Sequence, residues 1–165
     1  METMGSRINS TPPGMHSGRH PMYRSVRPGQ SVRPPTPVAV ATHTVLVIDD
    51  DDMVRRALVR GLRRNHVVVD LRSAEDALAL IASGRRFDAI LCDMNLDGMS
   101  GRDFFMNLDA AAEDQARRVV ILSGDPNTLD PELFGELPPR FIEKPASITT
   151  IEAILAELAL VQRAA

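Results

Sequence analysis

Residues 45–51 read Val-Leu-Val-Ile-Asp-Asp-Asp. Four consecutive apolar residues, three of them β-branched, predict a short strand that is buried on both faces, as in a parallel sheet. The stretch from Asp52 to Arg64 then spaces its apolar residues for one face of a helix. A buried strand followed directly by a helix is the repeating unit of an α/β fold.

The same alternation continues to the end of the chain. Ser73 and Ser147 are expected to cap helices, and a further helix is expected over residues 100–109. Prolines leave room for only a short fourth helix, with Asp130 as its N-cap and Pro131 at its first position. Five such units predict a doubly wound, five-stranded parallel sheet with helices on both faces. The four remaining strands are expected at residues 67–69, 89–92, 119–122 and 141–142.

The composition changes at residue 42. Residues 1–41 hold seven of the twelve prolines and five arginines against one glutamate, and they lack apolar periodicity. Such a segment cannot bury enough apolar surface to fold, so we expect a disordered Pro/Arg-rich tail. Residues 42–165 are expected to form one domain, with a net charge of −7 against +4 for the tail.

Composition also excludes several kinds of protein. The acidic domain argues against direct nucleic-acid binding, which needs a basic surface. No run of 18 apolar residues is present, so membrane insertion is not expected. The single cysteine, Cys92, excludes an internal disulfide and favours a reducing, cytoplasmic location.

Polar residues follow four of the five expected strands. Asp49 and Asp50 come after the first strand, Asp93 after the third, Ser123 after the fourth and Lys144 after the fifth. In an open α/β sheet the ligand crevice lies at the carboxyl ends of the strands, so these side chains are expected to gather at one edge. Lys144 is the only lysine in the chain.

The charge of this group predicts its chemistry. Two carboxylates about 4 Å apart repel by roughly 4 kcal/mol at an effective dielectric constant near 20, so three together need a cation. Oxygen ligands beside a phosphate suit Mg²⁺. A lysine and a hydroxyl opposite could hold phosphoryl oxygens while one carboxylate acts as nucleophile. The residues therefore predict phosphoryl transfer to or from an aspartate.

Five segments of the chain contain the site residues and the motifs around them: residues 45–51, 90–93, 99–101, 120–124 and 141–145. Taken in order, they resemble the receiver domains of bacterial two-component response regulators over nearly all of residues 44–163. The resemblance implies the strand order 2-1-3-4-5. About 20 residues follow Lys144, all of them needed for the last helix, so we expect a stand-alone receiver without an output domain.

The resemblance also implies a role for each site residue. Asp93 would be the phosphoacceptor and, with Asp50, a Mg²⁺ ligand. Asp49 would hold a metal-bound water, and the backbone carbonyl of Asn95 would supply another ligand. Asp97 departs from the family, which often has proline at this position in the loop after the acceptor.

The remaining implied roles concern the phosphoryl group and the switch. Ser123 would hydrogen-bond the phosphoryl group and Lys144 would pair with it, with a peptide to Pro145 that is commonly cis. Phe141 matches the aromatic residue whose rotamer couples to phosphorylation. The implied donors are a sensor histidine kinase or a histidine phosphotransfer protein, and the implied output is contact with a downstream protein of unknown identity. Such a module catalyses only its own phosphorylation and dephosphorylation.

Two other functions stay open. A Mg²⁺-dependent phosphatase of the haloacid-dehalogenase type would use Asp49 and Asp51 as its Asp-x-Asp pair, but only Glu152 and Glu157 follow Lys144 as acidic residues. A receiver-shaped interaction module that is never phosphorylated is the other. The arginines of the first helix are expected to be a solvated face, and no role is assigned to His43 or His66. These arginines are Arg55, Arg56, Arg60, Arg63 and Arg64.

Overall fold

The computed structural model describes residues 42–125 and 130–164. The tail expected over residues 1–41 lies outside them, and its disorder stays a prediction. Among the described helices, none combines the length and the apolar character that crossing a membrane requires. The elements are β1 (Thr44–Ile48), α1 (Asp52–Leu62), β2 (Val67–Leu71), α2 (Ala74–Ala82), β3 (Ala89–Asp93), α3 (Gly101–Ala111), α4 (Glu113–Ala116), β4 (Val119–Ser123), η2 (Pro131–Phe134), β5 (Arg140–Glu143) and α5 (Ile148–Ala164).

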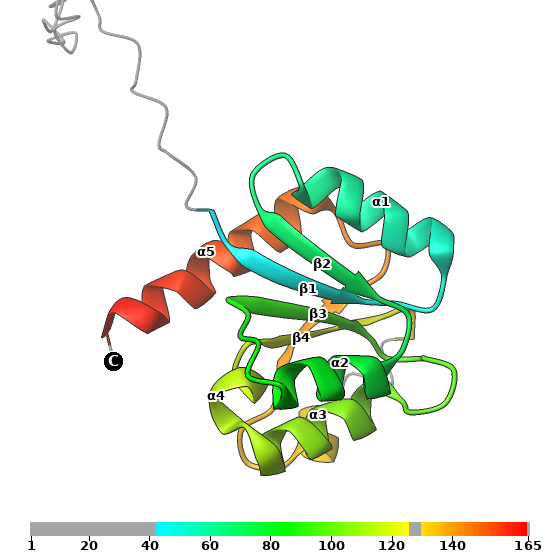
Figure 1. Cartoon of the computed structure of the whole chain (residues 1–165), viewed down its shortest axis with the longest axis vertical. Helices are drawn as coiled ribbons and strands as arrows, with labels where there is room; N and C mark the ends of the chain where they lie inside the picture. Colours follow the sequence, from blue (N-terminus) through cyan, green and yellow to red (C-terminus); the bar gives the residue numbers. More distant parts are fainter. Residues whose placement is uncertain (1–41, 126–129, 165) are drawn as a thin grey trace, which may run out of the picture. The chain divides into compact units, whose positions relative to one another are not determined.

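The five strands form one parallel sheet in the order β2-β1-β3-β4-β5 (Figure 1). β1 pairs with two neighbours, so that Val45 lies opposite Val68 of β2 on one side and Ala89 of β3 on the other. The doubly wound fold and its strand order are therefore confirmed. The strand order reverses between β1 and β3, which is where an open α/β sheet forms its ligand crevice.

Alternate residues of β1 point into two separate apolar cores. Leu46 and Ile48 pack with the buried residues of α2 and α3, whereas Val45 and Val47 pack with those of α1 and α5. The helices accordingly lie on opposite faces of the sheet (Figure 1). Because both faces are covered, β1, β3 and β4 are almost entirely buried, as their uninterrupted apolar sequence indicated.

The helix starts expected from the sequence are present. Ser73 caps α2 by accepting a hydrogen bond from the backbone N–H of Asp76 at 3.1 Å. Ser147 Oγ accepts one from the backbone N–H of Thr150 at 3.0 Å in the first turn of α5. Gly84 follows α2 with φ of +98°, a backbone conformation that glycine adopts without strain.

Two short helices show what the sequence pattern did and did not specify. The fourth helix expected between β4 and β5 is η2, a single 3-10 turn with Asp130 as its N-cap and Pro131 at its start, as predicted. The helix α4, between α3 and β4, was not predicted, because four residues are too few for a periodic pattern. Its Gln115 is buried and its Oε1 accepts a hydrogen bond from the backbone N–H of Phe87 at 2.9 Å.

Candidate functional site

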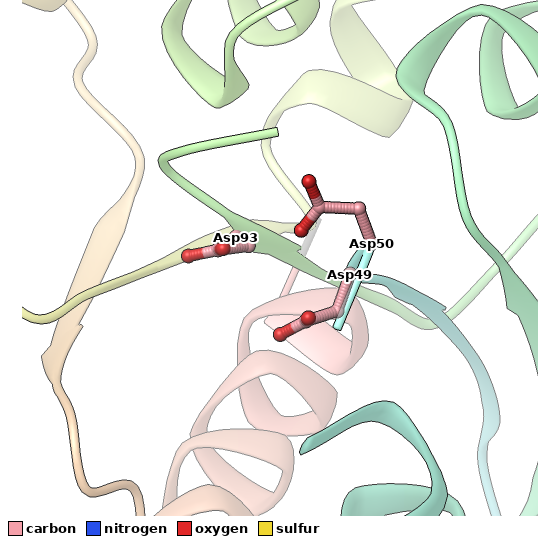
Figure 2. Close-up of side chains that lie close together, drawn as sticks. All are labelled: Asp49, Asp50 and Asp93. Carbon is pink, nitrogen blue, oxygen red and sulfur yellow. The ribbon is translucent and has the colours of Figure 1, made fainter. Parts of the chain in front are cut away.

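The strands bring the five polar residues expected at their carboxyl ends to the same edge of the sheet. Asp49 and Asp50 directly follow β1, Asp93 is the last residue of β3, and Ser123 is the last residue of β4. Lys144 directly follows β5, and its backbone N–H donates to the carbonyl oxygen of Ser123 at 2.7 Å. Figure 2 shows the three aspartates, two from the end of β1 and one from the end of β3.

The three carboxylates form a compact acidic cluster. Asp49, Asp50 and Asp93 each offer an oxygen atom, and these atoms all lie within 4.8 Å of one another. Asp49 is fully buried and Asp93 is 7% exposed, while Asp50 is half-buried. Three ionised carboxylates at this separation repel strongly in a partly desolvated site.

Lys144 partly balances this cluster. Its Nζ lies 2.9 Å from Asp93 Oδ1 and 3.1 Å from Asp49 Oδ2. Within residues 42–125 and 130–164, it is the one basic side chain that forms an ion pair with any of the three carboxylates. If all three are ionised, the cluster therefore keeps an excess of about two negative charges, which a divalent cation would neutralise.

The pKa values of this pair reflect burial and attraction. Burial raises the pKa of the Asp49 carboxyl, and the neighbouring Lys144 only partly opposes that effect. Burial also lowers the pKa of Lys144, but the hydrogen bond and the attraction from Asp93, together with Asp49, outweigh it and raise the pKa overall. Lys144 is therefore held in its charged form beside the acceptor candidate.

The donor set fits a hard divalent cation. Carboxylate oxygens are the ligands that Mg²⁺ prefers in proteins, and the cluster has three of them with too little positive charge nearby. Asn95 lies in the loop after β3 with its side chain exposed. Its expected contribution, through the backbone carbonyl, stays a prediction.

Backbone N–H groups hold two of the carboxylates in place. The N–H of Asp51 donates to Asp49 Oδ1 at 2.9 Å, and the N–H of Asp97 donates to Asp50 Oδ2 at 2.9 Å. The second of these bonds joins β1 to the loop between β3 and α3. Hydrogen bonds from backbone amides stabilise the ionised form of a carboxylate and fix its orientation.

Gly101 lets α3 start directly against the end of β3. A Cβ atom on this glycine would lie 2.3 Å from the carbonyl oxygen of Asp93 and 2.9 Å from Cα of Met94, distances that no side chain can occupy. The Gly101 N–H also donates to the carbonyl oxygen of Met94 at 2.9 Å. The backbone that carries Asp93 is thus packed against the first turn of the helix.

Ser123 and Phe141, the two other residues expected to take part, are not members of the acidic cluster. Ser123 is fully buried, and its Oγ both donates to the carbonyl oxygen of Asp125 and accepts from the Asp125 N–H, each at 3.1 Å. Phe141 is half-buried on β5, where its ring packs edge-on against Phe134 with centroids 5.1 Å apart. The peptide bond between Lys144 and Pro145 is cis, as the family resemblance implied.

Arg55 is the residue near the site that the sequence interpretation missed. It was expected on a solvated face, but it is only 7% exposed, and its Nη1 donates to the backbone carbonyl of Asp49 at 2.8 Å. Its guanidinium also pairs with Asp52 and with Asp70 of β2. The other four arginines of that group are exposed, as expected. Met53 is one of the apolar residues whose spacing predicted this helix, yet it is 82% exposed.

An apolar groove of about 480 Å³ opens next to Lys144. One wall comes from α1 and the other from the segment that joins β5 to α5. Lys144 therefore belongs both to the polar site and to the lining of an apolar groove large enough to receive side chains from another molecule. Its lining residues are Val54, Ala57, Leu58, Leu122, Lys144, Pro145, Ala146 and Ile148.

The family model of the response regulator receiver domain matches residues 45–156. The transcriptional regulatory protein FixJ of Rhizobium meliloti (strain 1021) is 30% identical over 114 residues, which cover 68% of this chain and 55% of that protein. The chain thus spans about half the length of this relative.

Solved structures of receiver domains are also similar to this chain. A response regulator receiver domain (CheY-like) from Methylobacillus flagellatus is 27% identical with a TM-score of 0.63, covering 72% of this chain and 99% of that one. A response regulator receiver domain protein from Clostridium thermocellum is 19% identical with a TM-score of 0.65, covering 73% and 96%. The second similarity concerns the fold alone.

Proposed function

Because the chain belongs to the response regulator receiver domain family, we propose that it accepts a phosphoryl group on Asp93 from a histidine kinase or a histidine phosphotransfer protein in the cytoplasm. The observation that carries this proposal is the pairing of Asp93 with Lys144 inside a cluster of three carboxylates. The module then acts as a phosphorylation switch through protein–protein contacts, and it catalyses only its own phosphorylation and dephosphorylation.

In this proposal, an oxygen of Asp93 attacks the phosphorus atom while the bond from phosphorus to the donor histidine nitrogen breaks. The product is an acyl phosphate on Asp93. Lys144, already 2.9 Å from Asp93 Oδ1, is placed to pair with the incoming phosphoryl oxygens. Ser123 would rotate its hydroxyl from the Asp125 carbonyl toward the same group.

A bound Mg²⁺ would add positive charge that neutralises both the carboxylates and the phosphoryl oxygens. Asp50, Asp93 and the carbonyl of Asn95 would hold it directly, with Asp49 binding one of its waters. The close approach of the three carboxylates supports this assignment. Arg55 would act on the site indirectly, as a positioning residue that fixes the Asp49 backbone.

The apolar groove supports a protein as the phosphoryl donor. A donor histidine must reach Asp93, and the groove between α1 and the start of α5 is lined in part by Lys144, which pairs with Asp93. Apolar side chains of a kinase or phosphotransfer domain would fill it. The phosphorylated state would then be read by a downstream protein, with Phe141 on β5 as the residue that changes conformation.

The phosphatase alternative is poorly supported by the contacts of its required residues. Asp51 is exposed and caps α1, its Oδ1 accepting from the N–H of Met53 at 2.7 Å. Glu152 pairs with His66, which precedes β2 and so lies at the opposite end of the sheet. Neither residue is therefore placed to complete the Asp-x-Asp site of a haloacid-dehalogenase enzyme.

Phosphorylation of the full chain tests the proposal. Wild type should incorporate label from acetyl phosphate or from a cognate kinase in the presence of Mg²⁺, as a base-labile acyl phosphate. Asp93→Asn should incorporate none, while Asp109→Asn, the same exchange at an exposed position of α3, should retain the label.

Two results would contradict the assignment. Wild-type labelling in Asp93→Asn would mean that another residue is the acceptor, and label found on Asp49 would favour the phosphatase. A wild-type chain that takes no label from any donor would instead indicate the interaction module that is never phosphorylated.

A further inference from the structure

The loop between β3 and α3 is tied to the acidic cluster by one hydrogen bond. The backbone N–H of Asp97 donates to Asp50 Oδ2 at 2.9 Å, across 47 residues of sequence. The side chain of Asp97 itself is exposed. The contact therefore belongs to the backbone, and any residue except proline could make it.

A second carboxylate holds the same loop from the other side. Glu75, in the first turn of α2, accepts a hydrogen bond from the Met99 N–H on its Oε1 at 3.1 Å. Between the two bonded residues, Gly98 has φ of +86°, a conformation that other residues rarely adopt. The middle of the loop is thus held at Asp97 by Asp50 and at Met99 by Glu75.

We propose that the Asp97 N–H is a positioning group that orients the Asp50 carboxylate for a divalent cation and so sets the affinity of the site for that cation. The inference rests on the proposed Mg²⁺ site. A hydrogen bond to one oxygen of a ligating carboxylate fixes its rotation and leaves the other oxygen free. It also places the positive end of an N–H dipole beside a cluster whose carboxylates outnumber its cations.

Two substitutions separate the backbone donor from the side-chain charge. Asp97→Ala removes the carboxylate and keeps the N–H, whereas Asp97→Pro removes both. The two variants therefore differ in the hydrogen bond to Asp50, and proline also restricts the backbone at positions 96 and 97. Mg²⁺ affinity is measured on the full chain by isothermal titration calorimetry, since the chain has no tryptophan whose fluorescence could report binding.

Asp97→Pro should bind Mg²⁺ about tenfold more weakly than Asp97→Ala, the lower end of what loss of a ligand-orienting contact costs. Equal affinities in the two variants would overturn the inference. Absence of Mg²⁺ binding in wild type would instead contradict the proposed metal site on which the inference depends, so the two failures are distinguishable.

Amide hydrogen exchange provides a readout that needs neither metal nor the proline variant. In Asp50→Ala, the Asp97 amide loses its acceptor and should exchange at least tenfold faster than in wild type, measured by NMR without metal. The Met99 amide, bonded to Glu75, should keep its wild-type rate. An unchanged Asp97 rate would show that the bond to Asp50 does not hold the loop, and it would overturn the inference.

Discussion

The two ends of the sheet both bury polar side chains, but only one end balances them. At the carboxyl end, three carboxylates lie close together, and Lys144 pairs with two of them, Asp49 and Asp93. At the amino end, His43 precedes β1 and His66 precedes β2; both are buried, and the backbone N–H of His43 donates to His66 Nδ1. Both clusters of polar residues flank strands of the same sheet.

The amino-end cluster is closed. The side chain of His66 is fully buried, its Nδ1 accepts from the backbone N–H of His43 at 3.2 Å, and its Nε2 lies 2.7 Å from Glu152 Oε2. Since Nδ1 accepts, Nε2 carries the proton and donates a hydrogen bond to Glu152 Oε2. Asn65 donates to the other oxygen of Glu152 at 3.1 Å. The sequence interpretation gave the two histidines no role, and the structure gives them this structural one.

The difference between the ends separates structural from functional polar groups. A cluster in which donors match acceptors needs nothing from outside and stabilises the fold. A cluster with surplus charge of one sign lowers its own stability until a ligand of opposite charge arrives. The carboxyl end therefore has the properties of a binding site, and the amino end has those of a tether between α5 and the start of β2.

The largest expected effect is that of metal on the unbalanced end. Because Mg²⁺ would bind the folded arrangement only, at 100 times its dissociation constant it should raise the free energy of unfolding by about 2.7 kcal/mol. Chemical denaturation of the full chain with Mg²⁺ and with EDTA measures this. If Mg²⁺ raises the free energy of unfolding of Asp50→Asn by the same amount, the cation binds elsewhere, and the contrast between the two ends of the sheet is wrong.

The next effect concerns the closed end and has no metal dependence. Glu152→Ala should lower the free energy of unfolding by about 2 kcal/mol, because it leaves the buried Nε2–H of His66 without an acceptor. Glu157→Ala is the matched control on the same helix, since its side chain is 64% exposed and lies 4.0 Å from Arg140. It should change stability by less than about 0.5 kcal/mol. Equal losses in the two variants would mean that the amino-end cluster is not a tether.

The smallest effect has the opposite sign. Without metal, Asp50→Asn should be more stable than wild type by about 1 kcal/mol, because it removes a repelling charge that Lys144 does not contact, while its amide oxygen can still accept from the Asp97 N–H. Denaturation in EDTA measures the difference. A loss of stability in this variant would mean that the cluster is already balanced, and the contrast between the two ends would disappear.

The sequence predicted the residues at the carboxyl end of the sheet but not the contacts at its amino end. Parallel strands align their carboxyl ends, so short apolar runs followed by Asp49, Asp93 and Lys144 were enough to place the site. No such rule joins His66 to Glu152, which lie 86 residues apart and meet only through the packing of α5. The burial of Arg55 was also missed. An arginine on a helix is ordinarily expected to face solvent, and no sequence rule predicts its bonds to Asp49 and Asp70.

Gly101 has a consequence for how mutational screens of this protein would be interpreted. A saturation library scored for phosphorylation would rank position 101 among the most sensitive in the chain, beside Asp93 itself. The residue contributes no functional group: every replacement would push its Cβ into the carbonyl oxygen of Asp93 and displace the backbone that carries the proposed acceptor. Sensitivity in such a screen would therefore mark two kinds of position, those that perform chemistry and those that leave room for it. Only a parallel abundance score would separate them.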